Sequence, residues 1–225
     1  MAKKAASKSP EQTALLQQIA ENLIRGKATE TKDLTQKAVD AKIPAGDILN
    51  DGLVAGMSVI GDRFKKNEVY VPEVLIAARA MKAGMVILKP LLKEAGVKAK
   101  GIVCVGTVKG DLHDIGKNLV CMMLEGAGFQ VVDLGVNVDP QKFVSAVQEN
   151  NADAIGMSAL LTTTMTSMKT AIDAFKEAGC REKVIIMVGG APLTQNFSDE
   201  IGADGYAPDA ASAVDLLASL MKKKK

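Results

Sequence analysis

The sequence predicts a helical bundle in its first part, followed by an α/β domain with a five-stranded parallel sheet. Apolar residues recur at helical spacing up to about residue 94, and no segment in this part has the pattern of a strand. A short Gly- and Lys-containing stretch follows at 96–100. After it, short apolar runs alternate with amphipathic segments, a pattern typical of buried parallel strands covered by helices on both faces.

Four helices are expected in the N-terminal part, and they indicate a four-helix bundle. The first begins at Ser9-Pro10-Glu11, because serine caps helices, proline suits the first turn and glutamate favours the positive end of the helix dipole. The other helices are expected at 31–41, 45–66 and 73–94. The expected organisation is a tail at 1–9, a helical domain at 10–95, a linker at 96–100 and an α/β domain at 101–225.

The α/β domain is expected to contain five strands, each followed by a helix. The runs that indicate strands are Ile102–Val105, Gln130–Leu134, Ala154–Met157, Val184–Val188 and, more weakly, Gly205–Ala207. Helical patterns lie at about 115–127, 140–150, 164–179, 193–200 and 208–221. This alternation predicts a doubly wound, flavodoxin-like (Rossmann-like) sheet, in which ligands bind at the carboxyl ends of the strands. That edge would carry residues 106–116, 135–139, 158–164 and 189–192.

Composition and charge exclude several classes of protein. The formal net charge is +2, and the C-terminal lysine run, interpreted as a solvated end, contributes four positive charges. The rest is therefore close to neutral, and with 3% aromatic residues there is no sign of a nucleic-acid surface. Neither a signal-peptide core nor a membrane-length apolar run is present, so we expect no membrane partner and a cytoplasmic location. Three widely spaced cysteines indicate reduced, buried thiols.

His113 is the only histidine of the sequence. A lone histidine is more often structural than a ligand. This one lies in the first strand-to-helix loop, on the edge expected to bind ligands, and Gly110 and Gly116 on either side would let a bulky planar group approach closely. A ligating histidine normally donates its second ring N–H to a carboxylate, and Asp111 suits that role.

The rest of the sequence limits the metal that His113 could bind. Without a second histidine or a cysteine cluster, a zinc site made of protein ligands alone cannot form. Any metal on His113 must therefore take most of its ligands from a macrocycle. Haem and corrinoid are the two candidates.

Three motifs resemble those of the cobalamin-binding domains in methionine synthase and in methyltransferase corrinoid proteins. Asp111-Leu112-His113-Asp114-Ile115-Gly116 matches D-x-H-x-x-G, and its extension from Gly110 to Asn118 resembles the version in those proteins. Gly156-Met157-Ser158-Ala159-Leu160 resembles G-x-S-x-L after the third strand. Gly189-Gly190, followed by Ala191, resembles the G-G after the fourth. The three motifs occur in the family's order and at strand ends, which makes the resemblance specific.

The N-terminal part resembles the four-helix bundle cap that precedes the cobalamin-binding domain in these proteins. The resemblance is carried by Gly61-Asp62-Arg63-Phe64 and by Tyr70-Val71-Pro72-Glu73-Val74-Leu75. It thus covers nearly all of residues 10–222. The implied fold is a helical cap joined to a flavodoxin-like cobalamin-binding domain.

The resemblance implies a methyl carrier without substrate activity of its own. Its cofactor would be cobalamin or a related corrinoid, bound base-off/His-on, with the cofactor's own base detached from cobalt. Cob(I)alamin would accept a methyl group from a substrate-specific corrinoid methyltransferase for methanol, a methylamine, betaine or an aryl methyl ether. An acceptor methyltransferase using tetrahydrofolate or coenzyme M would remove it, and a reductive activation protein would be a further partner.

The resemblance also assigns roles to individual residues. His113 would bind cobalt, Asp111 would accept its N–H, and Thr164 stands where methionine synthase has the serine of a proton relay. Tyr70 aligns with an aromatic residue over the upper cobalt face. A slot for the nucleotide tail would be lined by Ser158, Leu160, Thr162, Gly189, Gly190 and Ala191. The remaining cofactor-binding residues would be Gly110, Leu112, Asp114, Ile115 and Gly116.

Several of these residues have simpler explanations. Ser158 and Thr162-Thr163-Thr164 could cap the next helix, and Gly189-Gly190 could form only a turn. Asp114 could only favour the start of a helix. Tyr70 could pack on its own bundle.

Three other functions fit parts of the sequence. A subunit of an adenosylcobalamin mutase shares D-x-H-x-x-G but requires a large barrel. A B12-dependent sensor or regulator combines a similar cap and cobalamin domain with a DNA-binding or signalling module, and neither a helix-turn-helix before residue 10 nor a basic patch is found. A haem protein using His113 would leave the G-x-S-x-L and G-G motifs without a purpose.

Overall fold

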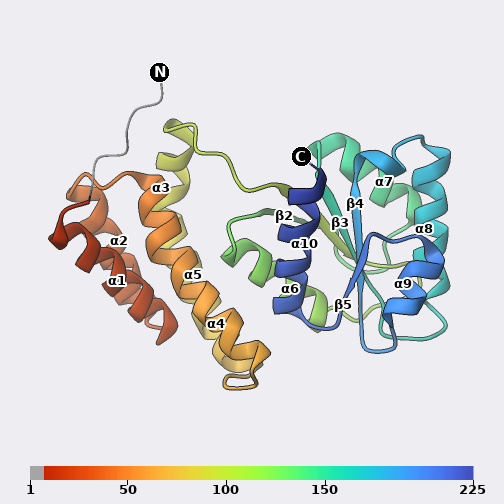
Figure 1. The fold of residues 1–225 in the computed structure, drawn as a ribbon, viewed down its shortest axis with the longest axis horizontal. Helices are drawn as coiled ribbons and strands as arrows, with labels where there is room; N and C mark the ends of the chain where they lie inside the picture. The colour runs from red at the N-terminus through yellow and green to blue at the C-terminus, as the bar shows by residue number, and fades with distance from the viewer. Residues whose placement is uncertain (1–7, 225) are drawn as a thin grey trace. The chain divides into compact units, whose positions relative to one another are not determined.

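The computed structural model describes residues 8–224 and divides into two compact units, one up to Lys98 and one from Ala99 onward (Figure 1). Most of the tail predicted at 1–9 therefore lies outside the described residues. Ser9 is described and caps the first helix as predicted: its Oγ accepts the backbone N–H of Gln12 at 3.2 Å, and its own N–H donates to the Gln12 side chain at 3.1 Å.

The N-terminal unit consists of helical segments. They are α1 (Pro10–Ile24), α2 (Ala28–Asp40), α3 (Ala45–Asp47), η1 (Ile48–Val54), α4 (Ala55–Lys65) and α5 (Val71–Glu94). The single helix predicted at 45–66 is thus interrupted by η1, a π-helical segment. Here Gly52 packs so closely on α1 that a Cβ would lie 3.1 Å from the Ile19 side chain. The spacing of apolar residues predicts a helix but does not distinguish a π-helical segment within it.

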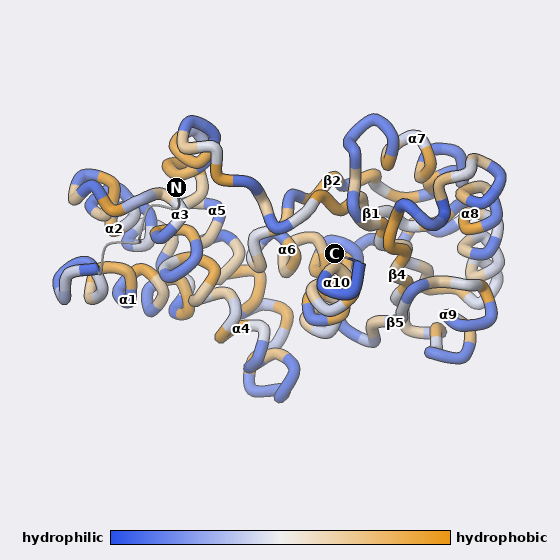
Figure 2. Tube along the Cα trace, turned by 45° about the horizontal axis from the view of Figure 1, so that its top comes forward, coloured by the Kyte–Doolittle hydropathy of each residue, from blue (hydrophilic) through white to orange (hydrophobic). Residues whose placement is uncertain are grey.

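One apolar core joins these segments. Hydrophobic and hydrophilic stretches alternate along the helices of this unit in Figure 2, as expected where one face of each helix enters a core. The apolar residues of the first helix that face this core are buried. Of the methionines that the sequence indicates as core residues, Met57 and Met81 are buried, whereas Met85 is half-buried. The largest fully buried side chains of the unit are Ile19, Leu23, Ile48, Leu53, Ile60 and Leu88.

The second unit is built on the predicted five-stranded parallel sheet. Its strands are β1 (Ile102–Thr107), β2 (Gln130–Asp133), β3 (Ala154–Ser158), β4 (Ile185–Gly189) and β5 (Gly205–Ala207). The strand order is β2-β1-β3-β4-β5, which confirms the flavodoxin-like order. Three strands run further than their apolar runs predicted, because polar or small residues still pair at their ends: Thr107 with Ser158, and Ser158 with Gly189.

Helices cover both faces of this sheet (Figure 1). They are α6 (Ile115–Gly126), α7 (Pro140–Asn150), α8 (Thr166–Glu177), α9 (Gln195–Ile201) and α10 (Ala210–Lys224), with a short 3₁₀ turn, η2 (Arg181–Lys183). Val103, Val105 and Met187 face the core beside α6 and α10, whereas Cys104 and Ile155 face the core beside α7 and α8. Alternate strand residues thus enter opposite cores, and the strand ends are left for loops.

The three cysteines are free and buried, as expected. Burial raises the pKa of Cys104 to about 11 and that of Cys121 to about 12, so both remain protonated thiols at neutral pH. Within residues 8–224, no helix is long and apolar enough to cross a membrane.

Candidate functional site

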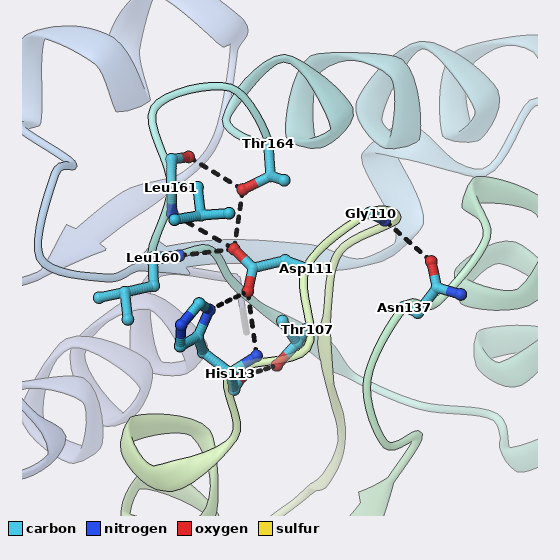
Figure 3. A network of polar contacts seen from close by, with 8 residues as sticks. All are labelled: Thr107, Gly110, Asp111, His113, Asn137, Leu160, Leu161 and Thr164. Carbon is cyan, nitrogen blue, oxygen red and sulfur yellow. Dashed lines mark hydrogen bonds and ion pairs between the residues drawn. The ribbon is translucent and has the colours of Figure 1, made fainter.

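The loops after β1, β2 and β3 converge at the carboxyl edge of the sheet, where the sequence predicts a site (Figure 3). Their backbones are joined directly. The Leu134 N–H donates to the Val105 carbonyl at 2.8 Å, and the Val108 N–H donates to the Ser158 carbonyl at 3.0 Å. Backbone hydrogen bonds thus connect the chain segments from which the three loops start.

Asp111 lies in the loop after β1, and its side chain is fully buried. Its Oδ1 accepts the backbone N–H of His113 at 3.0 Å, and its Oδ2 accepts the backbone N–H of Leu160 at 2.8 Å. Oδ2 also lies 3.3 Å from the N–H of Leu161 and 2.7 Å from the hydroxyl of Thr164 (Figure 3). A buried carboxylate is costly unless it is hydrogen-bonded, and here both oxygens are.

These contacts determine the charge of Asp111. Burial alone would raise the pKa of the carboxyl group, but donation by the Leu160 and His113 N–H groups, with that of the Thr164 hydroxyl and the His113 ring, outweighs it. The pKa is held well below its ordinary value. Asp111 is therefore a carboxylate at neutral pH, able to accept a ring N–H.

The ring of His113 is oriented by this carboxylate. Its Nδ1 lies 2.8 Å from Asp111 Oδ1 (Figure 3). An ionised carboxylate can only accept, so Nδ1 carries the proton of the neutral ring and Nε2 keeps a free lone pair. The side chain is 51% exposed, so Nε2 is available to a ligand. This is the arrangement that a histidine needs to bind a metal.

Thr107 holds the backbone of His113 in place. It is fully buried at the end of β1, and its hydroxyl donates to the His113 carbonyl at 2.8 Å (Figure 3). The sequence analysis did not identify this residue. A polar residue at the end of an otherwise apolar strand was the signal that could have found it.

Thr164 contacts the same carboxylate from the far side of the site. Its hydroxyl lies 2.7 Å from Asp111 Oδ2 and 2.9 Å from the Leu161 carbonyl, and its single proton can be donated to only one of them at a time. The alternative that it caps the next helix is wrong, because Met165 is at the N-cap of α8, without a side-chain cap. The substitution of threonine for serine thus keeps a hydroxyl on Asp111.

Exposed apolar side chains accompany the His113 ring. Leu112 is 72% exposed and Ile115 is 77% exposed, and both are sequence neighbours of His113. Leu160 and Leu161, whose N–H groups point at Asp111, are also exposed large apolar residues. A cluster of exposed apolar groups marks a binding surface. An apolar surface with one free imidazole nitrogen fits a large macrocycle that carries a metal.

The rest of the described chain offers no competing metal site. Among residues 8–224, no group of three or more His, Cys, Asp or Glu side chains could hold a metal ion. The site therefore offers one imidazole with a carboxylate behind it, and a metal bound there would need further ligands from a cofactor.

The glycine pair after β4 lies against the loop after β3. Gly190 has φ +138°, and a Cβ there would lie 1.8 Å from the Ala159 carbonyl oxygen. The Ala159 N–H also donates to the Gly189 carbonyl at 3.2 Å. Glycine is thus required at position 190 by the approach of protein backbone. The simpler explanation, a turn, fits this position, because the Leu193 N–H donates to the Gly190 carbonyl at 3.1 Å.

The other predicted site residues are less closely involved. Ser158 is half-buried at the end of β3, whereas Thr162 and Ala191 are exposed in the loops. Asp114 is at the N-cap of α6, and its carboxylate accepts the side-chain N–H of Asn118 at 3.0 Å. Tyr70 belongs to the helical unit, where it precedes α5 and is 63% exposed, so it does not pack into its own bundle.

Comparison with known proteins identifies the family. Two models described as B12 binding domain match the chain, over residues 101–215 and 15–89. A corrinoid protein of Desulfitobacterium hafniense (strain Y51) is 42% identical over 93% of this chain and 99% of its own length. The dimethylamine corrinoid protein of Methanosarcina barkeri is 45% identical over 89% of this chain and 94% of its own.

The chain belongs to the family of methyltransferase corrinoid proteins. A solved structure, the methanol:cobalamin methyltransferase complex of Methanosarcina barkeri, is similar with a TM-score of 0.82 and 30% identity, over 98% of this chain and 86% of that chain. Membership confirms the resemblance seen in the motifs, and the helical cap with the α/β domain confirms the fold class. Haem and corrinoid were the two macrocycles compatible with a lone histidine ligand. The match to a B12 binding domain identifies the corrinoid as the one that is bound.

Proposed function

We propose that this corrinoid protein carries a methyl group between two methyltransferases, on a corrinoid whose cobalt is coordinated by His113. The observation that carries the proposal is the buried Asp111 carboxylate, 2.8 Å from His113 Nδ1, which leaves Nε2 free among exposed apolar side chains. The corrinoid, when bound, supplies a cobalt centre that can accept and release a methyl group.

His113 would hold the cobalt, and Asp111 and Thr164 orient His113. Asp111 holds the ring in one tautomer, because the carboxylate accepts the Nδ1 proton in a hydrogen bond and leaves Nε2 free to bind metal. Thr164 supports Asp111 from the opposite oxygen, at 2.7 Å. Donation by Thr164 stabilises the carboxylate, whereas donation to the Leu161 carbonyl leaves Oδ2 to the backbone N–H groups. The Thr164 hydroxyl can thus direct its hydrogen bond to the Asp111 carboxylate or to the Leu161 carbonyl.

We also propose the base-off/His-on mode of binding. His113 would then bind cobalt in place of the cofactor's own base, and the loops after β3 and β4 would hold the nucleotide tail. The residues proposed to line this slot are Ser158, Leu160, Thr162, Gly189, Gly190 and Ala191. The contact between Gly190 and the Ala159 carbonyl supports this proposal, because it brings the loops after β3 and β4 together.

The relatives favour a class of methyl donor. The relative from Methanosarcina barkeri at 45% identity is named a dimethylamine corrinoid protein. We therefore propose a methylated amine as the donor ahead of methanol, betaine or an aryl methyl ether. The proposed partners are a substrate-specific corrinoid methyltransferase, an acceptor methyltransferase using tetrahydrofolate or coenzyme M, and a reductive activation protein.

The test of the ligand is the spectrum of the purified protein with hydroxocobalamin. We expect a base-off, His-on spectrum for the wild type, and for His113→Ala a shifted spectrum with an affinity that is lower by at least roughly tenfold. Added imidazole should restore the spectrum of the variant, because it supplies the missing nitrogen without the chain. An unchanged spectrum for His113→Ala would show that His113 is not the ligand.

A further inference from the structure

The loop after β2 contributes a residue to the site that the motifs do not include. Asn137 lies in this loop with φ +52°. Its backbone N–H donates to the Asp111 carbonyl at 2.9 Å, and its side-chain Oδ1 accepts the Gly110 N–H at 2.9 Å. Figure 3 shows the side chain reaching Gly110 from a separate segment of chain. One residue therefore holds the Gly110–Asp111 dipeptide at both ends.

This dipeptide needs such support. Gly110 has φ +83°, in a region that glycine leaves easily for other conformations. The backbone at Asp111 decides where its carboxylate points, and the carboxylate in turn orients the His113 ring at 2.8 Å. A change in the conformation of the dipeptide would therefore displace the ring, although Asn137 does not touch it.

The neighbours of Asn137 hold its backbone independently of its side chain. Val138 is buried, and its N–H donates to the Thr107 carbonyl at 2.9 Å. The Gly135 carbonyl accepts the Thr107 N–H at 3.0 Å. The loop after β2 is thus fixed to β1 on both sides of Asn137, so a change of its side chain removes the contact with Gly110 and little else.

Asparagine meets both requirements of this position. It tolerates a positive φ better than most residues, and its side chain carries a carbonyl oxygen. Glycine would keep the backbone and lose the acceptor. Aspartate would keep the acceptor, and its charge would be exposed to solvent, as Asn137 is. The two substitutions therefore separate the backbone from the hydrogen bond.

We propose that Asn137 is a positioning residue for the axial ligand, which sets the Asp111–His113 pair before the corrinoid binds. The inference rests on the proposed function, because the role of Asn137 depends on His113 being the cobalt ligand. A site formed in advance does not have to be ordered during binding, and the affinity is higher for that reason. Asn137 thus acts on ligation through the loop and without contact with the cofactor.

The experiment compares Asn137→Gly and Asn137→Asp by hydroxocobalamin titration. For Asn137→Gly we expect an affinity that is lower by roughly three- to tenfold, the worth of one hydrogen bond. We also expect a mixed spectrum in which part of the cofactor is not coordinated by His113. Asn137→Asp should restore both toward the wild type, and added imidazole should convert the mixed spectrum of Asn137→Gly to that of a nitrogen-coordinated cobalt.

The outcomes separate this inference from the proposed function. A wild-type spectrum and affinity for Asn137→Gly, while His113→Ala is shifted, would overturn the role of Asn137 alone. A lower melting temperature with an unchanged spectrum, or a failure of Asn137→Asp to restore ligation, would show a purely structural residue and also overturn it. Unchanged spectra for both Asn137→Gly and His113→Ala would instead contradict His113 ligation itself.

Discussion

The loop after β1 and the loop after β4 stand at the same edge of the sheet and are built in opposite ways. The first is held by polar atoms that converge on the buried Asp111 carboxylate, from Leu160, His113 and Thr164. The second depends on the absence of a side chain at Gly190, because a Cβ there would lie 1.8 Å from the Ala159 carbonyl oxygen.

This difference shows how one scaffold meets two demands. Orienting a metal ligand requires side chains with fixed hydrogen bonds. Close approach of two backbones requires a residue without a side chain. The first loop should therefore be sensitive to the loss of a polar atom, and the second to the gain of any atom. The two loops also meet, because Ala159 at the glycine contact precedes Leu160, which donates to Asp111.

The largest effect is expected for Gly190→Ala. The new methyl group would overlap the Ala159 carbonyl, and at φ +138° the backbone is strained for alanine. The loop after β3 must move, which displaces the Leu160 N–H from Asp111. We expect the melting temperature to fall by more than about 5 °C and hydroxocobalamin affinity to fall by more than roughly tenfold, measured by thermal unfolding and by titration.

Gly202→Ala is the matched control for this change. Gly202 also has a positive φ, +79°, but a Cβ there meets nothing within 4 Å. It should cost about 1 kcal/mol from backbone strain and leave cofactor binding unchanged. Equal behaviour of the two variants would mean that strain, and not the contact with Ala159, explains Gly190.

A smaller loss of stability is expected for Asp111→Asn in the first loop. A carboxylate has two acceptor oxygens, whereas the amide of asparagine has one oxygen and one NH₂ group. The NH₂ group would face donors that Asp111 now accepts, and those donors would lose their partner. Each buried group left without a partner costs about 1–3 kcal/mol. We expect a destabilised protein in denaturant titrations, and a changed pH dependence of His113 ligation in spectra with hydroxocobalamin. Asp114→Asn, the exposed neighbour, should remain within about 0.5 kcal/mol of the wild type.

The pH dependence gives a second check on Asp111. Its native pKa lies below that of the unfolded chain, so the unfolded state takes up the proton first. The stabilising contribution is therefore complete above the unfolded pKa, about 4, and is lost as the pH falls toward the native value. The difference in stability between wild type and Asp111→Asn should be constant at pH 5–7 and shrink below about pH 4. A difference that grew on acidification would contradict this account.

The fold could be predicted because each of its elements has a local signal. Strands such as Val103–Val105 are continuous apolar runs, and their alternation with helices determines a parallel sheet. The ends of β1, β3 and β4 were predicted too early, since Thr107, Ser158 and Gly189 pair in the ladder without being apolar. The π-helical segment at Ile48–Val54 was missed because its apolar spacing also fits an ordinary helix.

The site could be predicted from the sequence where a motif marks its residues, and this includes Thr164, which lies 53 residues from Asp111. Asp111 and His113 are two residues apart, so their contact follows from a single motif. Asn137 is 27 residues from Gly110, and only the hydrogen bonds between two loops bring them together. The local sequence around Asn137 does not distinguish it from an ordinary turn residue. Its contact with Gly110 could therefore not be predicted from a motif.

The smallest effect is expected for Thr107→Val, at the base of the first loop. Valine keeps the shape of threonine but leaves the His113 carbonyl without the hydroxyl that donates to it at 2.8 Å. The loss should be about 1 kcal/mol, or roughly 2–4 °C in melting temperature. The His113-coordinated fraction of bound hydroxocobalamin should also fall, because the ligand's backbone is released on one side.

Thr107→Ser makes this prediction sharp. Serine keeps the hydroxyl and removes a buried methyl group, which costs a similar amount, about 0.8 kcal/mol. The two variants should therefore unfold at similar temperatures, while only Thr107→Val changes the spectrum of the bound cofactor. If both variants changed the spectrum equally, packing at the end of β1 would position His113, and the rule that the first loop depends on its polar atoms would fail at this residue.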